Sequence, residues 1–311
     1  MAPHPAIKLL LGVAPWVAWA TADVDQVPRH IMSSERVAKT VVSDQLRLVF
    51  AMGLEGTGHH YTFAVEDLMF RKNPDLPRLG DFELTTDFYY TAHTMNESPQ
   101  RFSSARASAR AEMRELAQRA EEVPWPGTVQ VQRGGLSYPH EGGSLKVFGY
   151  IDMRLMAEAA EAEGVDFRVL YLRRSAKDLI VANTVHRNFQ DGLGDTATTT
   201  PEQRFIEYIK ILFTDMGVMH SFLGEIDPAF VVCHDWGYLG NADQAKNISE
   251  FIAPTPEVAS RLEQIFTESA TLRHNTTEDL PYEAAEVIAR LQKKLDAFES
   301  EYCASPLQIP V

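Results

Sequence analysis

Three short apolar segments constrain the fold of this chain more than any other feature. They are residues 46–51 (LRLVFA), 167–172 (FRVLYL) and 229–233 (AFVVC). Each is apolar along nearly its whole length instead of alternating with polar residues, which is typical of strands buried on both faces of a parallel sheet. Helical patterns separate the segments, as the crossover connections between parallel strands require. The sequence therefore predicts a three-layer α/β/α fold around a central parallel sheet.

The remaining elements follow from local patterns. Residues 128–132 (TVQVQ) alternate as a strand does, and residues 133–144 (RGGLSYPHEGGS) are rich in Gly and Pro and predict a long loop with a functional role. Helices are predicted at 60–70, 104–123, 152–163, 176–188, 201–223, 243–252, 256–267 and 281–298. The pattern indicates one domain over residues 45–300 and a C-terminal tail at 301–311.

The charge of the chain limits its partners. The 311 residues carry 29 basic and 43 acidic side chains, a formal net charge of -14. This balance disfavours nucleic acid or an anionic membrane surface, because both need a basic footprint. An anionic ligand would therefore need a local positive site.

The two cysteines leave two possibilities. Cys233 and Cys303 are too few for a disulfide framework, and their spacing matches no zinc pattern. One bridge and two buried free thiols are equally compatible with the sequence.

The N-terminus predicts the compartment. Lys8 precedes an apolar run at residues 9–20, and an Ala-Thr-Ala cleavage-like site follows. This order is typical of a secretory signal peptide over residues 1–22, with residues 23–44 as a linker. A short signal-anchor of the kind that Golgi enzymes retain is one alternative, and a cytosolic chain with an apolar start is another. We expect a protein of the Golgi lumen or a secreted one. Three N-x-[ST] sites, compatible with this route, lie at Asn96, Asn247 and Asn275.

A Gly-rich segment at residues 53–60 (GLEGTGHH) follows the first strand and precedes a helix. In such a turn, backbone N–H groups and a helix N-terminus hold phosphate or sulfate. The residues predicted to contact the anion are Gly53, Glu55, Gly56, Thr57, Gly58, His59 and His60. The spacing is that of a P-loop, but histidines occupy the Lys and Ser/Thr positions, which disfavours chemistry with ATP and magnesium. A tight turn without a ligand is the alternative. A metal site at the paired histidines is not expected, because neighbouring side chains point to different faces.

Arg173 and Arg174 follow the strand at 167–172 and are predicted to emerge at the same sheet edge as the Gly-rich segment. The arginine fork suits a phosphate, because it makes two parallel hydrogen bonds and is always charged. Asp178, in the first turn of the next helix, is placed to hold an arginine. The alternative is an ion-paired strand end without a ligand.

These segments resemble three elements of the sulfotransferase family. Residues 167–189 resemble its 3′-phosphate-binding strand and helix, Gly56-Thr57 its phosphosulfate loop, and residues 229–252 its late strand, turn and helix. The resemblance runs in the same order over residues 46–252. It implies a P-loop NTPase-like fold and 3′-phosphoadenosine 5′-phosphosulfate as the co-substrate, without a metal.

The chain departs from the family pattern at several positions. Leu54 stands where many members carry a basic residue, and Ala176 replaces a proline. Ala182 replaces the helix serine, for which Asn183 or Ser175 would be the nearest polar substitute. The C-terminal basic-glycine element of cytosolic members is not found. These departures leave open a catalytically inactive binding protein, and a P-loop kinase is a further alternative.

The resemblance implies sulfuryl transfer by in-line displacement, in which positioning and charge stabilisation do most of the work. A general base for the acceptor hydroxyl is predicted at His140, with Glu55 as its rival. His59 or His60 would supply positive charge at the leaving phosphate. The acceptor is a hydroxyl of a glycan, a protein or a small molecule, with carbohydrate as the first expectation.

Overall fold

The structure of the protein is a computed structural model. It describes residues 46–54, 57, 68, 71, 99–121, 128–132, 137, 138, 140, 141, 148, 149, 153–182, 209, 212, 213, 216, 217, 219, 220, 223–238, 240–253, 255–268 and 285–303. The predicted signal peptide or anchor and the linker lie outside these residues. So do all but one residue, Leu68, of the helix predicted at residues 60–70.

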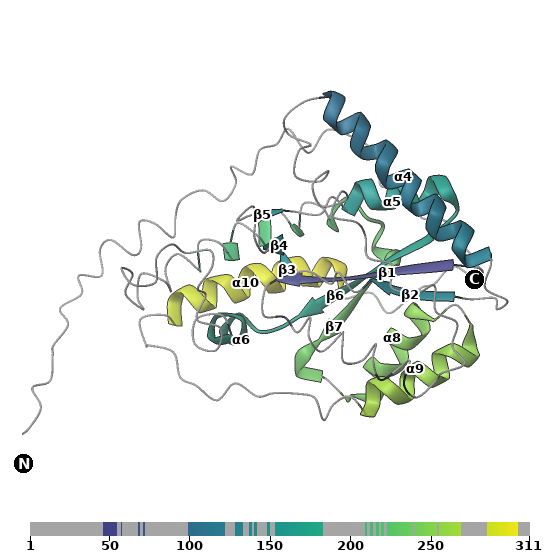
Figure 1. The fold of residues 1–311 in the computed structure, drawn as a ribbon. Helices are drawn as coiled ribbons and strands as arrows, with labels where there is room; N and C mark the ends of the chain where they lie inside the picture. The colour runs from purple at the N-terminus through teal and green to yellow at the C-terminus, as the bar shows by residue number, and fades with distance from the viewer. Residues whose placement is uncertain are drawn as a thin grey trace, which may run out of the picture. The chain divides into compact units, whose positions relative to one another are not determined.

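A parallel sheet forms the centre of the described structure (Figure 1). Its strands are β1 (Leu46–Leu54), β2 (Thr128–Gln132), β6 (Asp166–Arg173) and β7 (Val231–Asp235), in the order β2-β1-β6-β7. All neighbouring pairs are parallel, and the two-residue strand β3 (Ser137–Tyr138) extends the pairing beside the end of β1. The predicted α/β class with a central parallel sheet is confirmed.

The start of β7 and the segment at 133–144 differ from their predictions. The third apolar run does not begin as a strand: Pro228–Phe230 forms a short 3-10 helix, η5, and β7 starts at Val231. The cause is a cap, because the Asp227 carboxylate accepts a hydrogen bond from the Ala229 N–H at 3.0 Å. The predicted loop at 133–144 contains β3 and also β4 (His140–Glu141), which pairs antiparallel with β5 (Phe148–Gly149). A strand of two residues is too short to show the alternation of apolar and polar residues from which strands are predicted.

Helices lie on both sides of the sheet (Figure 1). On one side are α4 (Pro99–Glu121) and α5 (Met153–Glu163), and on the other are α8 (Ala242–Ile252) and α9 (Pro256–Glu268). The short α6 (Ala176–Val181) follows β6, and α10 (Ala285–Tyr302) packs against α6 and β7.

A glycine turn and a hydrophobic core position the helices against the sheet. Gly164, with φ of 72°, ends α5 and lets the chain turn directly into β6. A hydrophobic core joins β1, β6 and β7 to α8 and α9, and includes Val49, Ala51, Leu170, Leu172, Val232, Ile248, Phe251, Ile252, Leu262, Ile265 and Phe266.

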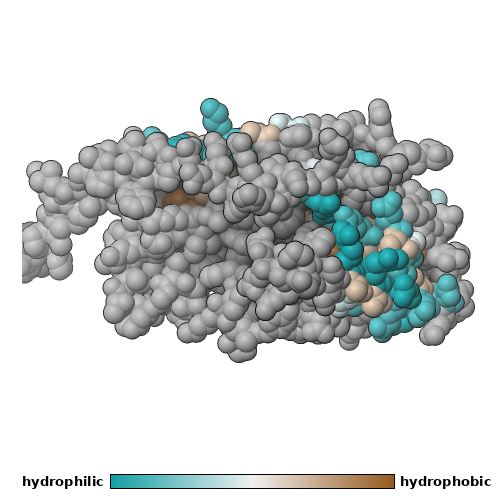
Figure 2. Space-filling model, turned by 90° about the horizontal axis from the view of Figure 1, so that it is seen from above, coloured by the Kyte–Doolittle hydropathy of each residue, from teal (hydrophilic) through white to brown (hydrophobic). Residues whose placement is uncertain are grey.

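Salt bridges connect the outer helices α4 and α5. Arg114 contacts Glu163 at 2.8 Å, and Arg106 contacts Glu158 at 2.7 Å. The arginines of these pairs are exposed, so each pair contributes little to stability. Described residues that reach the surface on the face shown in Figure 2 are mainly hydrophilic. Among the described helices, none combines the length and the apolar character that a membrane crossing needs.

A buried ionic cluster lies at the start of β1 and β6. The Arg47 Nε donates to Asp166 Oδ2 at 2.8 Å, and Arg168 donates to the same carboxylate at 3.1 Å from both Nε and Nη2. One carboxylate thus faces two guanidinium groups. The second positive charge is met by main-chain carbonyls at the end of α8: the Phe251 oxygen accepts from both arginines, and the Ala253 oxygen accepts from Arg47. The partially negative end of a helix suits this contact.

Candidate functional site

The carboxyl ends of β1, β6 and β7 meet at one edge of the sheet, because the three strands are parallel neighbours. Ligands of parallel sheets bind at this edge. The predicted site residues that the structure describes here are Gly53, Thr57, Arg173 and Arg174. Glu55, Gly56, Gly58, His59, His60 and Asn183 lie outside the described residues.

The end of β1 differs from the prediction, because Gly53 and Leu54 belong to the strand and not to a loop. Thr57 closes the turn that follows. Its backbone N–H and its hydroxyl both donate to the Leu54 carbonyl, at 3.0 and 2.7 Å. Thr57 is buried, so its hydroxyl serves the turn. The first part of the Gly-rich segment is therefore a tight strand-to-turn connection.

Gly53 is required by close packing. A Cβ at this position would lie 2.4 Å from Thr57 Oγ1 and 3.0 Å from both Cβ and the carbonyl oxygen of Leu172. The positive φ values among the described glycines fall at Gly164 and Gly240, so a left-handed backbone is not the reason for Gly53. The glycine lets β1 approach β6 and the turn closely.

Replacing Gly53 with alanine is expected to lower the free energy of unfolding by about 1–3 kcal/mol, because the added methyl overpacks the turn. Urea unfolding checks this. A double-mutant cycle with Thr57→Ala tests the cause, since removing Oγ1 removes the closest contact. The double variant should lose less stability than the two single losses together; strict additivity would contradict this packing explanation.

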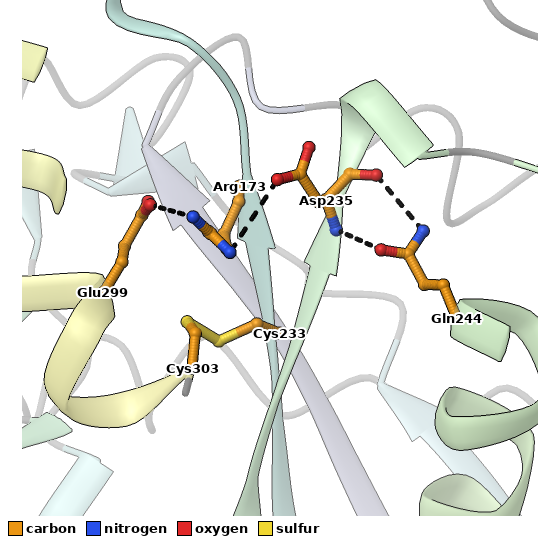
Figure 3. The surroundings of a disulfide bond; sticks show 6 residues. All are labelled: Arg173, Cys233, Asp235, Gln244, Glu299 and Cys303. Carbon is orange, nitrogen blue, oxygen red and sulfur yellow. Dashed lines mark hydrogen bonds and ion pairs between the residues drawn. A yellow bond between two sulfur atoms is a disulfide. The ribbon is translucent and has the colours of Figure 1, made fainter. Parts of the chain in front are cut away.

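Arg173, the last residue of β6, is held by two carboxylates (Figure 3). Its Nη2 donates to Glu299 Oε2 of α10 at 2.5 Å, and its Nη1 lies 3.7 Å from Asp235 Oδ2. Arg173 and Asp235 are direct register partners in the β6–β7 pair. The contacts are those of the ion-paired strand end, the alternative that the sequence left open.

The two carboxylates are fixed differently. Glu299 is only 5% exposed, and this burial raises its pKa even though the Arg173 contact opposes the shift. Asp235 is part-exposed and accepts a hydrogen bond from the Gly237 N–H at 2.7 Å. The Gln244 side chain accepts from the Asp235 N–H at 3.0 Å and donates to its carbonyl at 3.2 Å (Figure 3). The end of β7 is therefore held in a defined orientation.

Arg174 has a different environment from Arg173. The guanidinium carbon lies 5.0 Å from the centroid of the Trp236 ring, within the range of a cation–π contact. Arg174 and Trp236 each follow the register pair Arg173–Asp235 by one residue. The Arg174 side chain thus spans from the end of β6 to the end of β7. It is half-buried.

The start of α6 is closed by its own residues and by Gln292 of α10. The Ser175 Oγ accepts from the Asp178 N–H at 3.1 Å and donates to the Asp178 carboxylate at 2.8 Å. The Ala176 N–H donates to Gln292 Oε1 of α10 at 2.8 Å. These contacts form an N-cap, which explains why Ser175 and Asp178 stand three residues apart. Ala182 is the last described residue of this segment.

Cys233 and Cys303 form a disulfide, with a Cα–Cα distance of 5.5 Å (Figure 3). This settles the choice that the sequence left open between a bridge and two free thiols. The bridge joins β7 to the residue that follows α10, within the segment that the sequence assigned to the C-terminal tail.

His140, the predicted base, lies in β4 opposite Gly149 of β5. This hairpin is a two-stranded sheet separate from the central one. The side chain of His140 lies outside the described part of the structure. Sequence reasoning missed Glu299 and Gln292, which reach the site from 126 and 116 residues away. A predicted Cys233–Cys303 bridge would have indicated Glu299, because Glu299 lies one helical turn before Cys303 and the bridge brings that turn to β7.

Within the part of the chain that the structure describes, no group of three His, Cys, Asp or Glu side chains is arranged to hold a metal ion. No family model, no curated protein and no solved structure matches this chain.

Proposed function

We propose that the protein binds a nucleotide phosphosulfate, 3′-phosphoadenosine 5′-phosphosulfate, at the carboxyl edge of β1, β6 and β7 and transfers its sulfuryl group to an acceptor hydroxyl. One observation carries the proposal: Arg174 lies on the Trp236 ring beside the turn that ends β1. A half-buried cation at this edge of a parallel sheet suits an anionic nucleotide.

The described residues fit such a ligand in part. Arg174 would hold the 3′-phosphate. The backbone N–H groups of the Gly-rich segment other than that of Thr57, which donates to the Leu54 carbonyl, would face the other end of the nucleotide. Arg173 fits less well, because two carboxylates already face it. The bound co-substrate supplies the sulfuryl group. His140 or Glu55 would accept the proton of the hydroxyl, and His59 or His60 would face the leaving phosphate.

The disulfide supports the proposed compartment. Disulfides persist in oxidising environments such as the lumen of the secretory pathway and are rare in the cytosol. A Cys233–Cys303 bridge therefore agrees with the proposed signal sequence and with a Golgi or secreted location.

A second candidate is a binding protein of the secretory pathway without transferase activity. Leu54 is fully buried at the end of β1, where it can supply no charge to a bridging oxygen. Arg173 is engaged by Glu299 and Asp235. Both observations favour nucleotide binding without turnover.

Calorimetric titration with 3′-phosphoadenosine 5′-phosphate tests the binding site. Wild type is expected to bind. Arg174→Ala is expected to bind about 10- to 100-fold more weakly, because it loses one or more charge-assisted hydrogen bonds. Arg106→Ala, which removes an exposed arginine of α4, is the matched control and should bind as wild type does. Absence of binding by folded wild-type protein would exclude this nucleotide as the ligand.

Labelled phosphosulfate then separates the two candidates. Transfer of label to a glycan, protein or small-molecule hydroxyl identifies a transferase. Binding that is lost in Arg174→Ala, without transfer to any acceptor class, identifies the inactive binding protein.

A further inference from the structure

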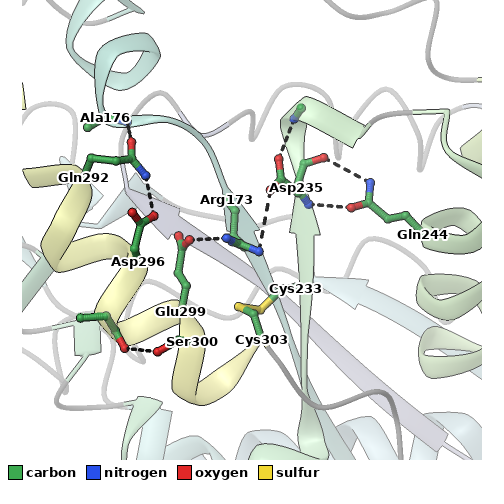
Figure 4. A network of polar contacts seen from close by, with 12 residues as sticks. Arg173, Ala176, Cys233, Asp235, Gln244, Gln292, Asp296, Glu299, Ser300 and Cys303 are labelled. Atoms are coloured by element: carbon green, nitrogen blue, oxygen red, sulfur yellow. Dashed lines mark hydrogen bonds and ion pairs between the residues drawn. A yellow bond between two sulfur atoms is a disulfide. The ribbon is translucent and has the colours of Figure 1, made fainter. Parts of the chain in front are cut away.

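Helix α10 and Cys303, the residue that follows it, are attached to the candidate site at three points (Figure 4). Gln292 accepts from the Ala176 N–H, Glu299 accepts from Arg173, and Cys303 is bonded to Cys233. The spacings of seven and four residues place all three on one side of the helix. The same side of α10 therefore meets the start of α6, the end of β6 and β7.

The disulfide secures the helical turn that carries Glu299. The Cys303 N–H donates to the Glu299 carbonyl at 2.7 Å, so the bridged residue closes that last turn. At its other end the bridge joins Cys233, two residues before Asp235. One covalent bond thus connects the two segments that bring carboxylates to Arg173.

The charges at Arg173 oppose an anionic ligand while both carboxylates are present. The Arg173 guanidinium together with the Glu299 and Asp235 carboxylates carries a net charge of about -1, and this negative charge repels phosphate or sulfate. Removing Glu299 alone would leave a neutral pair, in which the guanidinium has donors for a further acceptor.

We propose that the Cys233–Cys303 disulfide is a redox latch on Arg173. While the bridge is closed, Glu299 is held against the guanidinium. A dithiol reductant opens the latch: it gives two electrons and two protons, the S–S bond breaks to two thiols, and the dithiol becomes a disulfide. The last turn of α10 then moves away from Arg173. That the ligand is a nucleotide rests on the proposed function. The effect of the disulfide on the accessibility of Arg173 does not depend on the identity of the ligand.

The rest of α10 is expected to stay in place after reduction. Leu291 and Leu295 are buried, and Gln292 remains hydrogen-bonded to Ala176. Reduction would therefore release one turn and leave the helix docked. The chain has no other cysteine, so a dithiol acts at this bridge alone.

The test treats the full chain with phenylglyoxal, which reacts with accessible arginine side chains. Peptide mass spectrometry measures the rate at which Arg173 is modified. Dithiothreitol-reduced protein and oxidised Glu299→Gln are both expected to react at Arg173 at least about tenfold faster than oxidised wild type, because a charge-assisted pair is lost. Glu286→Gln is the matched control: it removes an exposed carboxylate from the first turn of the same helix and should leave the rate unchanged.

Each outcome decides the proposal. Reduction that leaves the Arg173 rate unchanged in folded protein overturns it, and so does reduction that unfolds the chain, since the bridge would then be a structural support. Glu299→Gln keeps the bridge, and an unchanged rate in that variant also overturns it. A parallel titration with 3′-phosphoadenosine 5′-phosphate separates the two proposals: faster Arg173 modification without nucleotide binding supports the latch and rejects the proposed function.

Discussion

Replacing Asp166 with asparagine is expected to lower the free energy of unfolding by about 3–5 kcal/mol, the usual cost of breaking a buried ion pair. Asp166 is fully buried and is the carboxylate between Arg47 and Arg168. Asparagine keeps the volume but removes the charge, so the two buried guanidinium groups would lose the carboxylate that both of them contact. Urea unfolding followed by circular dichroism measures the loss.

A surface pair provides the matched control for this prediction. Glu158→Gln removes a carboxylate from contacts with Arg106 and Arg154 on partly exposed helices. Its cost should stay below about 1 kcal/mol. Equal losses in the two variants would show that burial of the Asp166 cluster has no special weight.

Acid is expected to destabilise the protein through His234, by about 2 kcal/mol between pH 6.5 and pH 5. His234 is buried in β7 beside the Phe266 ring, and burial lowers its pKa to about 3. In the unfolded chain its pKa is about 6.5. Below that pH the unfolded chain takes up a proton that the folded chain does not, so stability falls as the pH falls from 6.5 toward 3. His220, whose pKa is also lowered to about 3 by burial, adds a loss of the same sign.

The variant His234→Gln isolates this contribution. The slope of unfolding free energy against pH, averaged between 5 and 6.5, should drop by about 1 kcal/mol per pH unit, whatever the stability of the variant at neutral pH. Phe266→Leu serves as the control, because it weakens the same contact and leaves the histidine in place. An unchanged slope in His234→Gln would show that His234 is protonated in the folded state.

The fold was largely predictable because its strongest signal is the composition of the strands. Residues 46–51 and 167–172 could be identified as buried strands from their apolar runs alone, and both lie in the sheet at β1 and β6. The start of β7 could not, because the Asp227 cap and Pro228 compete with the strand through hydrogen bonds that composition does not reveal.

The candidate site was predictable only where it is local in sequence. The placement of Arg173 at the edge follows from the end of a strand. Its partner Glu299 does not, since it is one of many acidic residues on exposed helical patterns and reaches Arg173 through the docking of α10. Likewise the contact of Arg174 with Trp236 depends on the β6–β7 register, which one sequence does not specify.

The buried arginines also determine how much of the chain must be made before it can fold. Arg47 donates to the Phe251 carbonyl across 204 positions of sequence. A fragment that stops at residue 250 would still contain all four long strands and Asp166, yet the main-chain carbonyls of Phe251 and Ala253 that accept from Arg47 and Arg168 would be missing. Such a fragment is expected to remain unfolded, and the folding of a growing chain would have to wait for the end of α8.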